Sequence, residues 1–154
     1  AVLGTGESRY ENLFRYAQRT YPGRLAARIE YNDALARRIY AGADMFLVPS
    51  LFEPCGLTQM IAMRYGTVPI VRETGGLKDT VIPYNEYEHT GDGFSFANYN
   101  GDELLNTVNY SKYVFFEKKA EWNKMVDRGM QKDYSWKNSK ANYEGLYSYL
   151  MGES

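Results

Sequence analysis

Segments that favour strands alternate with amphipathic helical segments along most of the chain. The clearest strand is 44–48, which is apolar from Met45 to Val48, stops before Pro49 and is typical of a central parallel strand buried on both faces. Further strands are expected at about 2–3, 24–30, 68–71 and 94–96, and helices at about 8–20, 33–41, 57–65, 102–110, 116–132 and 135–151. This order predicts an α/β fold with a doubly wound, Rossmann-like parallel sheet.

The domain organisation expected from this pattern is a single domain over 1–154, with C-terminal helices at about 102–151. No internal repeat, low-complexity segment or linker divides the chain. The chain opens directly with a strand-like pattern, which we interpret as a fragment boundary, so the domain is expected to be partial and truncated at its N-terminal edge. The last expected helix has an apolar face formed by Tyr143, Leu146, Tyr147 and Leu150.

Charge and cysteine content narrow the classes of function. The 18 Lys and Arg residues nearly balance the 19 Asp and Glu residues, so there is no general electrostatic attraction to nucleic acid or to an anionic membrane. Any anion must therefore be held locally. Cys55 is the single cysteine, which excludes an internal disulfide and suits a reducing cytoplasm. No apolar run approaches the roughly 20 residues that span a bilayer.

The loop at 49–57 is the strongest candidate for chemistry, because ligands of doubly wound sheets bind outside the carboxyl ends of the strands. Gly56 lets the backbone approach a ligand closely, and the amides of Leu57, Thr58 and Gln59 at the start of the next helix can bind a phosphate. Glu53 lies near the same position and suits sugar hydroxyls. From physical chemistry alone, an N-capped helix beside an exposed glutamate explains the pattern equally well.

Other loops carry weaker signals. Residues 4–9 have two glycines of a dinucleotide fingerprint but Arg9 where the third should be, which favours an ordinary tight turn. The glycine-bearing turn at 72–80 leads into a short helix, and its Arg72 and Lys78 either compensate phosphate charge or are solvated surface side chains.

Two reactive residue types are interpreted as structural or surface groups. The single histidine, His89, lies in a polar loop without a second histidine nearby, so we expect it on the surface and expect no catalytic metal site. Cys55 has no histidine partner in its motif and is interpreted as a small, partly buried thiol.

Three motifs together resemble the C-terminal domain of bacterial glycogen synthases and plant starch synthases. They are Phe52-Glu53-Pro54-Cys55-Gly56-Leu57-Thr58-Gln59, Arg64-Tyr65-Gly66-Thr67-Val68-Pro69 and Thr74-Gly75-Gly76-Leu77-Lys78-Asp79-Thr80-Val81. The similarity extends over almost the whole chain, because 38–44 and Tyr134-Ser135-Trp136 also match.

The resemblance implies a retaining glycosyltransferase with two Rossmann-like domains (the GT-B fold), an active site between them, and a donor, ADP-glucose, held mainly by this part. Tyr31 would then stack on adenine. Glu53 would be the catalytic residue that binds glucose hydroxyls, with the amides of Cys55 and Gly56 on the sugar. Leu57 and Thr58 would hold the distal phosphate. The departing diphosphate would assist attack by the 4-hydroxyl at the non-reducing end of an α-1,4-glucan, without a cofactor or metal.

This chain departs from the family pattern at its beginning. The family's basic Arg and Lys pair and its acceptor-binding N-terminal domain have no counterpart in 1–154. Each cation supplies a phosphate bond of roughly 1.5–3 kcal/mol, so the chain alone is expected to bind donor weakly and to be inactive. Its partners would be ADP-glucose, α-1,4-glucan and the missing domain. The exposed edge of an incomplete parallel sheet offers a surface for self-association, and the oligomeric state stays open.

Two alternative functions remain open. One is a UDP-sugar-dependent retaining glycosyltransferase of the same fold. Many such enzymes carry a second glutamate eight residues after the first, where this chain has Ile61, which favours the synthase. The other is a noncatalytic module that binds nucleotides or glucan.

Overall fold

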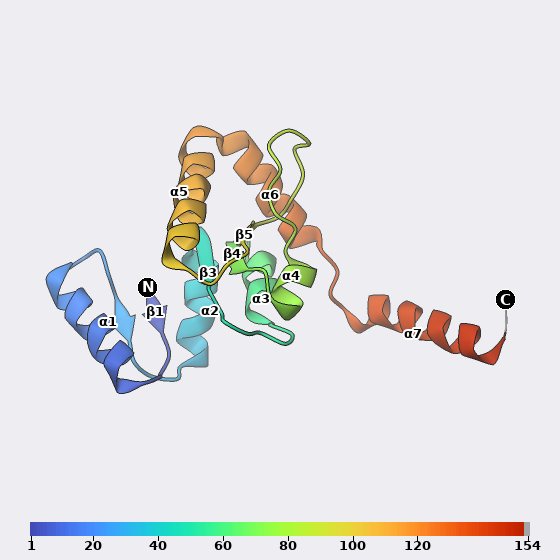
Figure 1. The fold of residues 1–154 in the computed structure, drawn as a ribbon, viewed down its shortest axis with the longest axis horizontal. Helices are drawn as coiled ribbons and strands as arrows, with labels where there is room; N and C mark the ends of the chain where they lie inside the picture. The colour runs from blue at the N-terminus through green and yellow to red at the C-terminus, as the bar shows by residue number, and fades with distance from the viewer. Residues whose placement is uncertain (153–154) are drawn as a thin grey trace. The chain divides into compact units, whose positions relative to one another are not determined.

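The computed structural model describes residues 1–152, without the side chain of residue 138. Helices alternate with short parallel strands over the first two thirds of the chain, and three helices follow (Figure 1). The expected α/β fold with parallel strands is confirmed. The chain divides into two compact units, Ala1–Ala43 and Asp44 onward. The assignment of 1–154 to one partial domain stays a prediction.

The first unit contains two strands and two helices. They are β1 (Val2–Leu3), α1 (Ser8–Thr20), β2 (Ala27–Arg28) and α2 (Asp33–Gly42). β1 pairs in parallel with β2, with Val2 opposite Ala27. The Gln18 side chain of α1 accepts a hydrogen bond of 2.6 Å from the amide of Ala27, which joins α1 to β2. Asn32 caps α2 by accepting the amide hydrogen of Leu35 at 2.9 Å.

The second unit is built on three parallel strands in the order β3-β4-β5. These are β3 (Met45–Val48), β4 (Val68–Arg72) and β5 (Phe94–Phe96). β1 and β2 belong to the first unit and pair with each other, whereas β3, β4 and β5 pair within the second unit. Within this unit, the prediction that 44–48 is a central strand buried on both faces is wrong: β3 lies at the end of the β3-β4-β5 sheet, and its Leu47 is 44% exposed. The central, buried strand is β4.

Alternate residues of β4 face two hydrophobic clusters, which gives this unit its layers. Val68 and Ile70 pack in a cluster completed by Tyr84, Phe94, Val114, Trp122 and Met125. Val71 packs in the other, with Val48, Met63, Leu77 and Val81. The first cluster draws on α5 (Gly101–Glu117) and α6 (Lys119–Gln131), and the second on α3 (Thr58–Arg64) and α4 (Gly75–Thr80). Helices thus cover both faces of this sheet, as in a doubly wound fold.

The C-terminal helices differ from the sequence prediction in their boundaries. α5 was expected to end near Tyr110 but continues to Glu117, because Val114 is fully buried and holds the extra turns in the core. Lys118 leaves the helical conformation and separates α5 from α6. α7 (Trp136–Met151) forms as expected, but the four residues of its predicted apolar face, Tyr143, Leu146, Tyr147 and Leu150, are each more than half exposed. No helix within 1–152 combines the length and apolar character needed to cross a membrane.

Candidate functional site

The loop from β3 to α3, residues 49–57, lies at the carboxyl end of the sheet, as predicted. Glu53 is half-buried, whereas Cys55 is an exposed free thiol. The interpretation of Cys55 as partly buried is therefore wrong. In this turn the buried residue is Gly56, and the neighbouring Cys55 faces solvent. Gly56 has a φ of 70°, a left-handed conformation that favours glycine. A Cβ atom on Gly56 would lie 3.1 Å from Cγ of Glu53, so the glutamate side chain runs beside Gly56.

Two glycines at the start of α4 pack directly against this loop. A Cβ atom on Gly75 would overlap the carbonyl oxygen of Glu53, and one on Gly76 would overlap that of Cys55. The amide of Gly76 also donates a hydrogen bond of 3.3 Å to the carbonyl of Pro54. The Gly75-Gly76 turn was predicted from the sequence, but its packing against the loop was not. The signal was the glycine pair itself, because adjacent glycines mark a close approach of another backbone segment.

The start of α3 offers unoccupied backbone donors. Leu57 is the N-cap residue, and the first helical bond runs from the amide of Ile61 to the carbonyl of Leu57 at 2.9 Å. No side chain caps the helix, so the alternative of an N-capped helix does not describe this loop. Leu57 and Thr58 are both exposed, and no acceptor within the described chain takes their amide hydrogens. Such amides can bind an anion.

Gln59 does not belong to this outward-facing group, because the residue is fully buried. Only the backbone amide of Gln59 was predicted from the sequence to take part in the site, and the role of its side chain was not predicted. Its Nε2 atom donates to the carbonyl of Gly56 at 2.8 Å and to the hydroxyl of Thr80 at 2.9 Å. The same hydroxyl donates to the carbonyl of Gly76. These bonds connect the 49–57 loop with α4.

The two basic candidates of the turn at 72–80, Arg72 and Lys78, have different environments. Lys78 is exposed, as expected of a solvated side chain. Arg72 is half-buried, and its Nη1 donates to the carbonyl of Leu51 at 3.3 Å. Its Cζ atom also lies 5.7 Å from the ring centroid of Tyr99. Arg72 is therefore not a fully solvated surface arginine. Through the carbonyl of Leu51 it supports the first half of the 49–57 loop.

The remaining candidates, Tyr31 and His89, lie outside the 49–57 loop. Tyr31 belongs to the first compact unit, where it precedes the N-cap of α2 and is 92% exposed. Its ring is therefore available for stacking. His89 is exposed, as predicted, and its Nδ1 lies 3.1 Å from a carboxylate oxygen of Glu121. Within 1–152, no cluster of three or more histidine, cysteine, aspartate or glutamate side chains is arranged to hold a metal ion.

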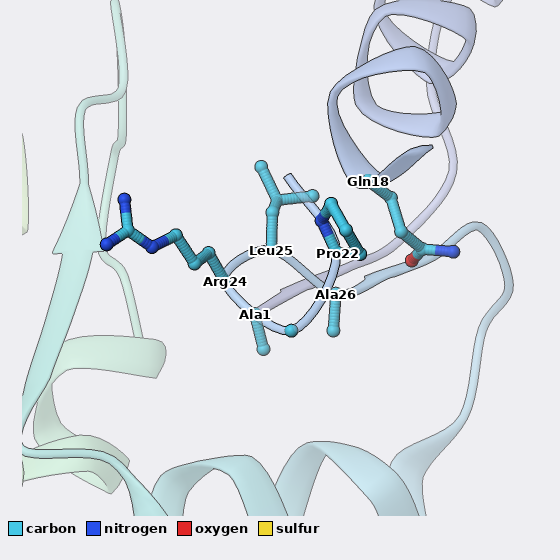
Figure 2. A pocket seen from close by; sticks show the side chains of 7 residues that line it. Ala1, Gln18, Pro22, Arg24, Leu25 and Ala26 are labelled. Atoms are coloured by element: carbon cyan, nitrogen blue, oxygen red, sulfur yellow. The ribbon is translucent and has the colours of Figure 1, made fainter. Parts of the chain in front are cut away.

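Two hollows of the described surface contain none of the predicted site residues. One, of about 510 Å³, lies in the first unit between the end of α1 and β2 (Figure 2). Its lining consists mostly of small or apolar residues: Ala1, Gln18, Pro22, Gly23, Arg24, Leu25 and Ala26. The other, of about 590 Å³, lies along residues 82–90 beside Tyr110. The candidate site is instead an open loop surface around Glu53 and Thr58.

Comparisons with known proteins agree with the motifs. The model of the family described as "Glycosyl transferases group 1" matches residues 27–112. Glycogen synthases of Lachnospira eligens and Lachnoclostridium phytofermentans are 62% and 58% identical to this chain, over 97% of it. The resemblance to glycogen synthases is thereby confirmed. In each case the match covers 31% of the relative, so the chain spans about a third of the length of these curated relatives.

Solved structures give the same result for the fold. The catalytic domain of starch synthase IV from Arabidopsis thaliana, a structure bound to ADP and acarbose, matches with a TM-score of 0.81 and 33% identity. That match covers 95% of this chain and 31% of the other. Sucrose-phosphate synthase from Thermosynechococcus elongatus matches with a TM-score of 0.66 at 23% identity over 99% of this chain and 38% of that one, which bears on the fold alone.

Proposed function

The chain belongs to the group 1 glycosyl transferases, and on this premise we propose that it is the C-terminal, nucleotide-sugar-binding part of a glycogen or starch synthase. The complete enzyme would transfer glucose from ADP-glucose to the non-reducing end of an α-1,4-glucan with retention of configuration. The identity of 62% to a glycogen synthase supports this proposal. Its acceptor-binding part would correspond to the two thirds of the relatives' length that the chain does not span.

The observation that carries the proposal is the arrangement at 53–58. The half-buried Glu53 lies beside Gly56, and the amides of Leu57 and Thr58 follow with no acceptor within the described chain. A carboxylate near a phosphate is unfavourable unless a neutral group lies between them. A nucleotide sugar meets this condition, because the hexose can bind Glu53 while the diphosphate binds the amides at the start of α3.

The proposed reaction uses these groups in two ways. The bond between the anomeric carbon of glucose and the phosphate oxygen breaks, and a bond to the acceptor's 4-hydroxyl oxygen forms. The proton of that hydroxyl passes to the departing diphosphate on the same face of the sugar. The amides of Leu57 and Thr58 stabilise the negative charge that develops on the diphosphate. Glu53 orients the sugar through its hydroxyls. No cofactor or metal takes part in this scheme.

An adenine nucleotide is the proposed donor base. Tyr31 is almost fully exposed and is proposed to stack on adenine, an interaction that an exposed aromatic ring can make without rearranging the protein. The starch synthase IV structure, which contains ADP and acarbose, supports an adenine nucleotide and a glucan-like acceptor. Ile61 occupies the position where many UDP-sugar enzymes have a second glutamate. A cytoplasmic location is part of the proposal, because the donor and the polymer would be made there.

A titration separates this function from its alternatives. The full-length protein is titrated calorimetrically with ADP, UDP and maltooligosaccharides. The proposal predicts tighter binding of ADP than of UDP. Tighter binding of UDP would support the UDP-sugar enzyme, and glucan binding without ADP binding would support a noncatalytic module.

A substitution tests the role of the carboxylate. Glu53→Gln keeps the size of the side chain but removes its charge. The variant is expected to lose glucosyl transfer by about 100-fold or more, since orientation of the sugar depends on this side chain, while ADP affinity changes little. Glu7→Gln is a matched control, because Glu7 is an exposed glutamate outside the loop. Full activity of Glu53→Gln would contradict the assignment.

A further inference from the structure

The side chain of Gln59 is a buried polar group that the proposed reaction does not use directly. Its amide nitrogen donates to the carbonyl of Gly56 and to the hydroxyl of Thr80, and that hydroxyl donates in turn to the carbonyl of Gly76. We call this set of bonds the Gln59–Thr80 bridge. One end of the bridge lies in the loop that carries Glu53, and the other lies in α4.

Packing alone does not require a glutamine at this position. Oε1 of Gln59 is buried and has no hydrogen-bond partner within 1–152. A buried acceptor without a partner is unfavourable, so a methionine of similar length would fill the space without this penalty. Nε2, in contrast, bonds two acceptors at 2.8 and 2.9 Å. The two donated bonds, rather than the volume of the side chain, distinguish glutamine from an apolar residue here.

The bridge is attached at the point where the loop turns. Gly56 has a left-handed conformation, and a Cβ atom on it would lie 2.7 Å from Oε1 of Gln59 and 3.1 Å from Cγ of Glu53. The amide group of Gln59 and the side chain of Glu53 therefore both lie next to the same glycine, close to the position that a Cβ atom would take. The next residues along the chain are Leu57 and Thr58, whose amides face outward. A shift of the Gly56 carbonyl would move these donors relative to Glu53.

The other end of the bridge is fixed independently of the loop. The carbonyl of Thr80 accepts hydrogen bonds from Nζ of Lys132 at 2.7 Å and from the hydroxyl of Tyr134 at 3.1 Å. Lys132 is also paired with the buried carboxylate of Asp92. Thr80 is thus held from the segment that joins α6 to α7, which gives the bridge a firm attachment.

We infer that Gln59 and Thr80 are positioning residues, which hold the Gly56 carbonyl and thereby set the Leu57 and Thr58 amides where the donor diphosphate binds. This inference rests on the proposed function. Neither residue touches the reacting atoms; both act through the loop. Their loss should therefore change how the nucleotide binds, in addition to any change in stability.

Four variants of the full-length protein test the inference. Gln59→Met removes both donated bonds at nearly constant length, and Thr80→Val removes the hydroxyl at nearly constant shape. Thr80→Ser keeps the hydroxyl and serves as the conservative rescue. Gln131→Met makes the same chemical change as Gln59→Met at an exposed position and is the matched control. Each protein is assayed for KM and kcat with ADP-glucose, for Kd of ADP by calorimetry and for its thermal midpoint.

The inference predicts a specific pattern. Gln59→Met and Thr80→Val raise KM for ADP-glucose and Kd for ADP, and lower kcat/KM on the order of 10- to 100-fold. Thr80→Ser and Gln131→Met stay within about twofold of wild type, and KM for glucan does not change. The double variant Gln59→Met with Thr80→Val is little worse than either single variant, because both remove the same connection.

Other outcomes of these measurements would overturn the inference. A merely structural role lowers the fraction of folded enzyme, which reduces kcat and the thermal midpoint but leaves KM and the Kd of ADP unchanged. That outcome, or wild-type behaviour of Gln59→Met and Thr80→Val, overturns the inference while the proposed function stands. If Gln59→Met fails to fold, Thr80→Val and Thr80→Ser decide alone. Wild-type protein that neither binds ADP nor transfers glucose overturns the proposed function and this inference with it.

Discussion

The α-carbon of Gly76 lies directly against the carbonyl group of Cys55, with no room for a Cβ atom between them. Gly75 approaches the carbonyl of Glu53 in the same way. Because α4 can come this near only where side chains are missing, these two glycines set the distance between α4 and the loop that carries Glu53. The site therefore depends on residues that cannot contact a substrate through a side chain.

Gly76→Ala tests this close packing. The added methyl group must push the loop away from α4, which is expected to reduce the free energy of unfolding by about 1–3 kcal/mol and to weaken ADP binding. Chemical denaturation and calorimetry measure the two effects. Gly101→Ala is the matched control, because a Cβ atom at Gly101 meets nothing within 4 Å. Equal stability and ADP affinity of the two variants would show that the contact is not important.

Tyr31 allows binding to be separated from stability. Its side chain is 92% exposed, so Tyr31→Ala should change the free energy of unfolding by less than about 0.5 kcal/mol. If the ring stacks on adenine, the same substitution should weaken ADP binding by about 1–3 kcal/mol. Tyr31→Phe keeps the ring and should bind as wild type does. Unchanged ADP affinity in Tyr31→Ala would exclude Tyr31 from the donor site.

The stability of the protein should depend on Tyr134 at alkaline pH. Burial, with a smaller contribution from the Asp92 carboxylate, raises the pKa of Tyr134 from 10.0 to about 12. The folded state thus favours the protonated phenol, which donates to the carbonyl of Thr80. This contribution is fully present below about pH 10 and is lost as the pH rises towards 12.

Denaturation of wild type and Tyr134→Phe across this range isolates the effect. Phenylalanine cannot ionise, so the difference in free energy of unfolding between the two proteins should shrink or reverse between pH 10 and 12. A difference that stays constant over that range would contradict the assigned role of the Tyr134 hydroxyl.

The sequence predicted the elements well because their signals are local. The apolar run before Pro49, the amphipathic pattern of α1 and the glycines after β4 each determine a short segment without reference to distant residues. The site loop was located for the same reason, since a glycine between a strand and a helix suggests an anion-binding turn. The motif at 52–59 then connected that loop to a family.

The features that were missed depend on contacts between distant segments. Within the second unit β4, and not β3, is the central strand, because an apolar pattern does not specify which strands pair. Arg72 was interpreted either as a phosphate-binding or as a solvated side chain, but it donates to the carbonyl of Leu51 and lies beside the ring of Tyr99. The bridge from Gln59 to Thr80 spans 21 residues of sequence.

The most direct test of the donor site observes the amide of Leu57 itself. Full-length protein labelled with 15N-leucine is titrated with ADP and with AMP, and the Leu57 resonance is assigned by its disappearance in Leu57→Met. We predict that ADP shifts this resonance strongly and that AMP, which lacks the distal phosphate, shifts it much less. An unchanged Leu57 resonance at an ADP concentration that saturates binding by calorimetry would show that the diphosphate does not bind at the start of α3.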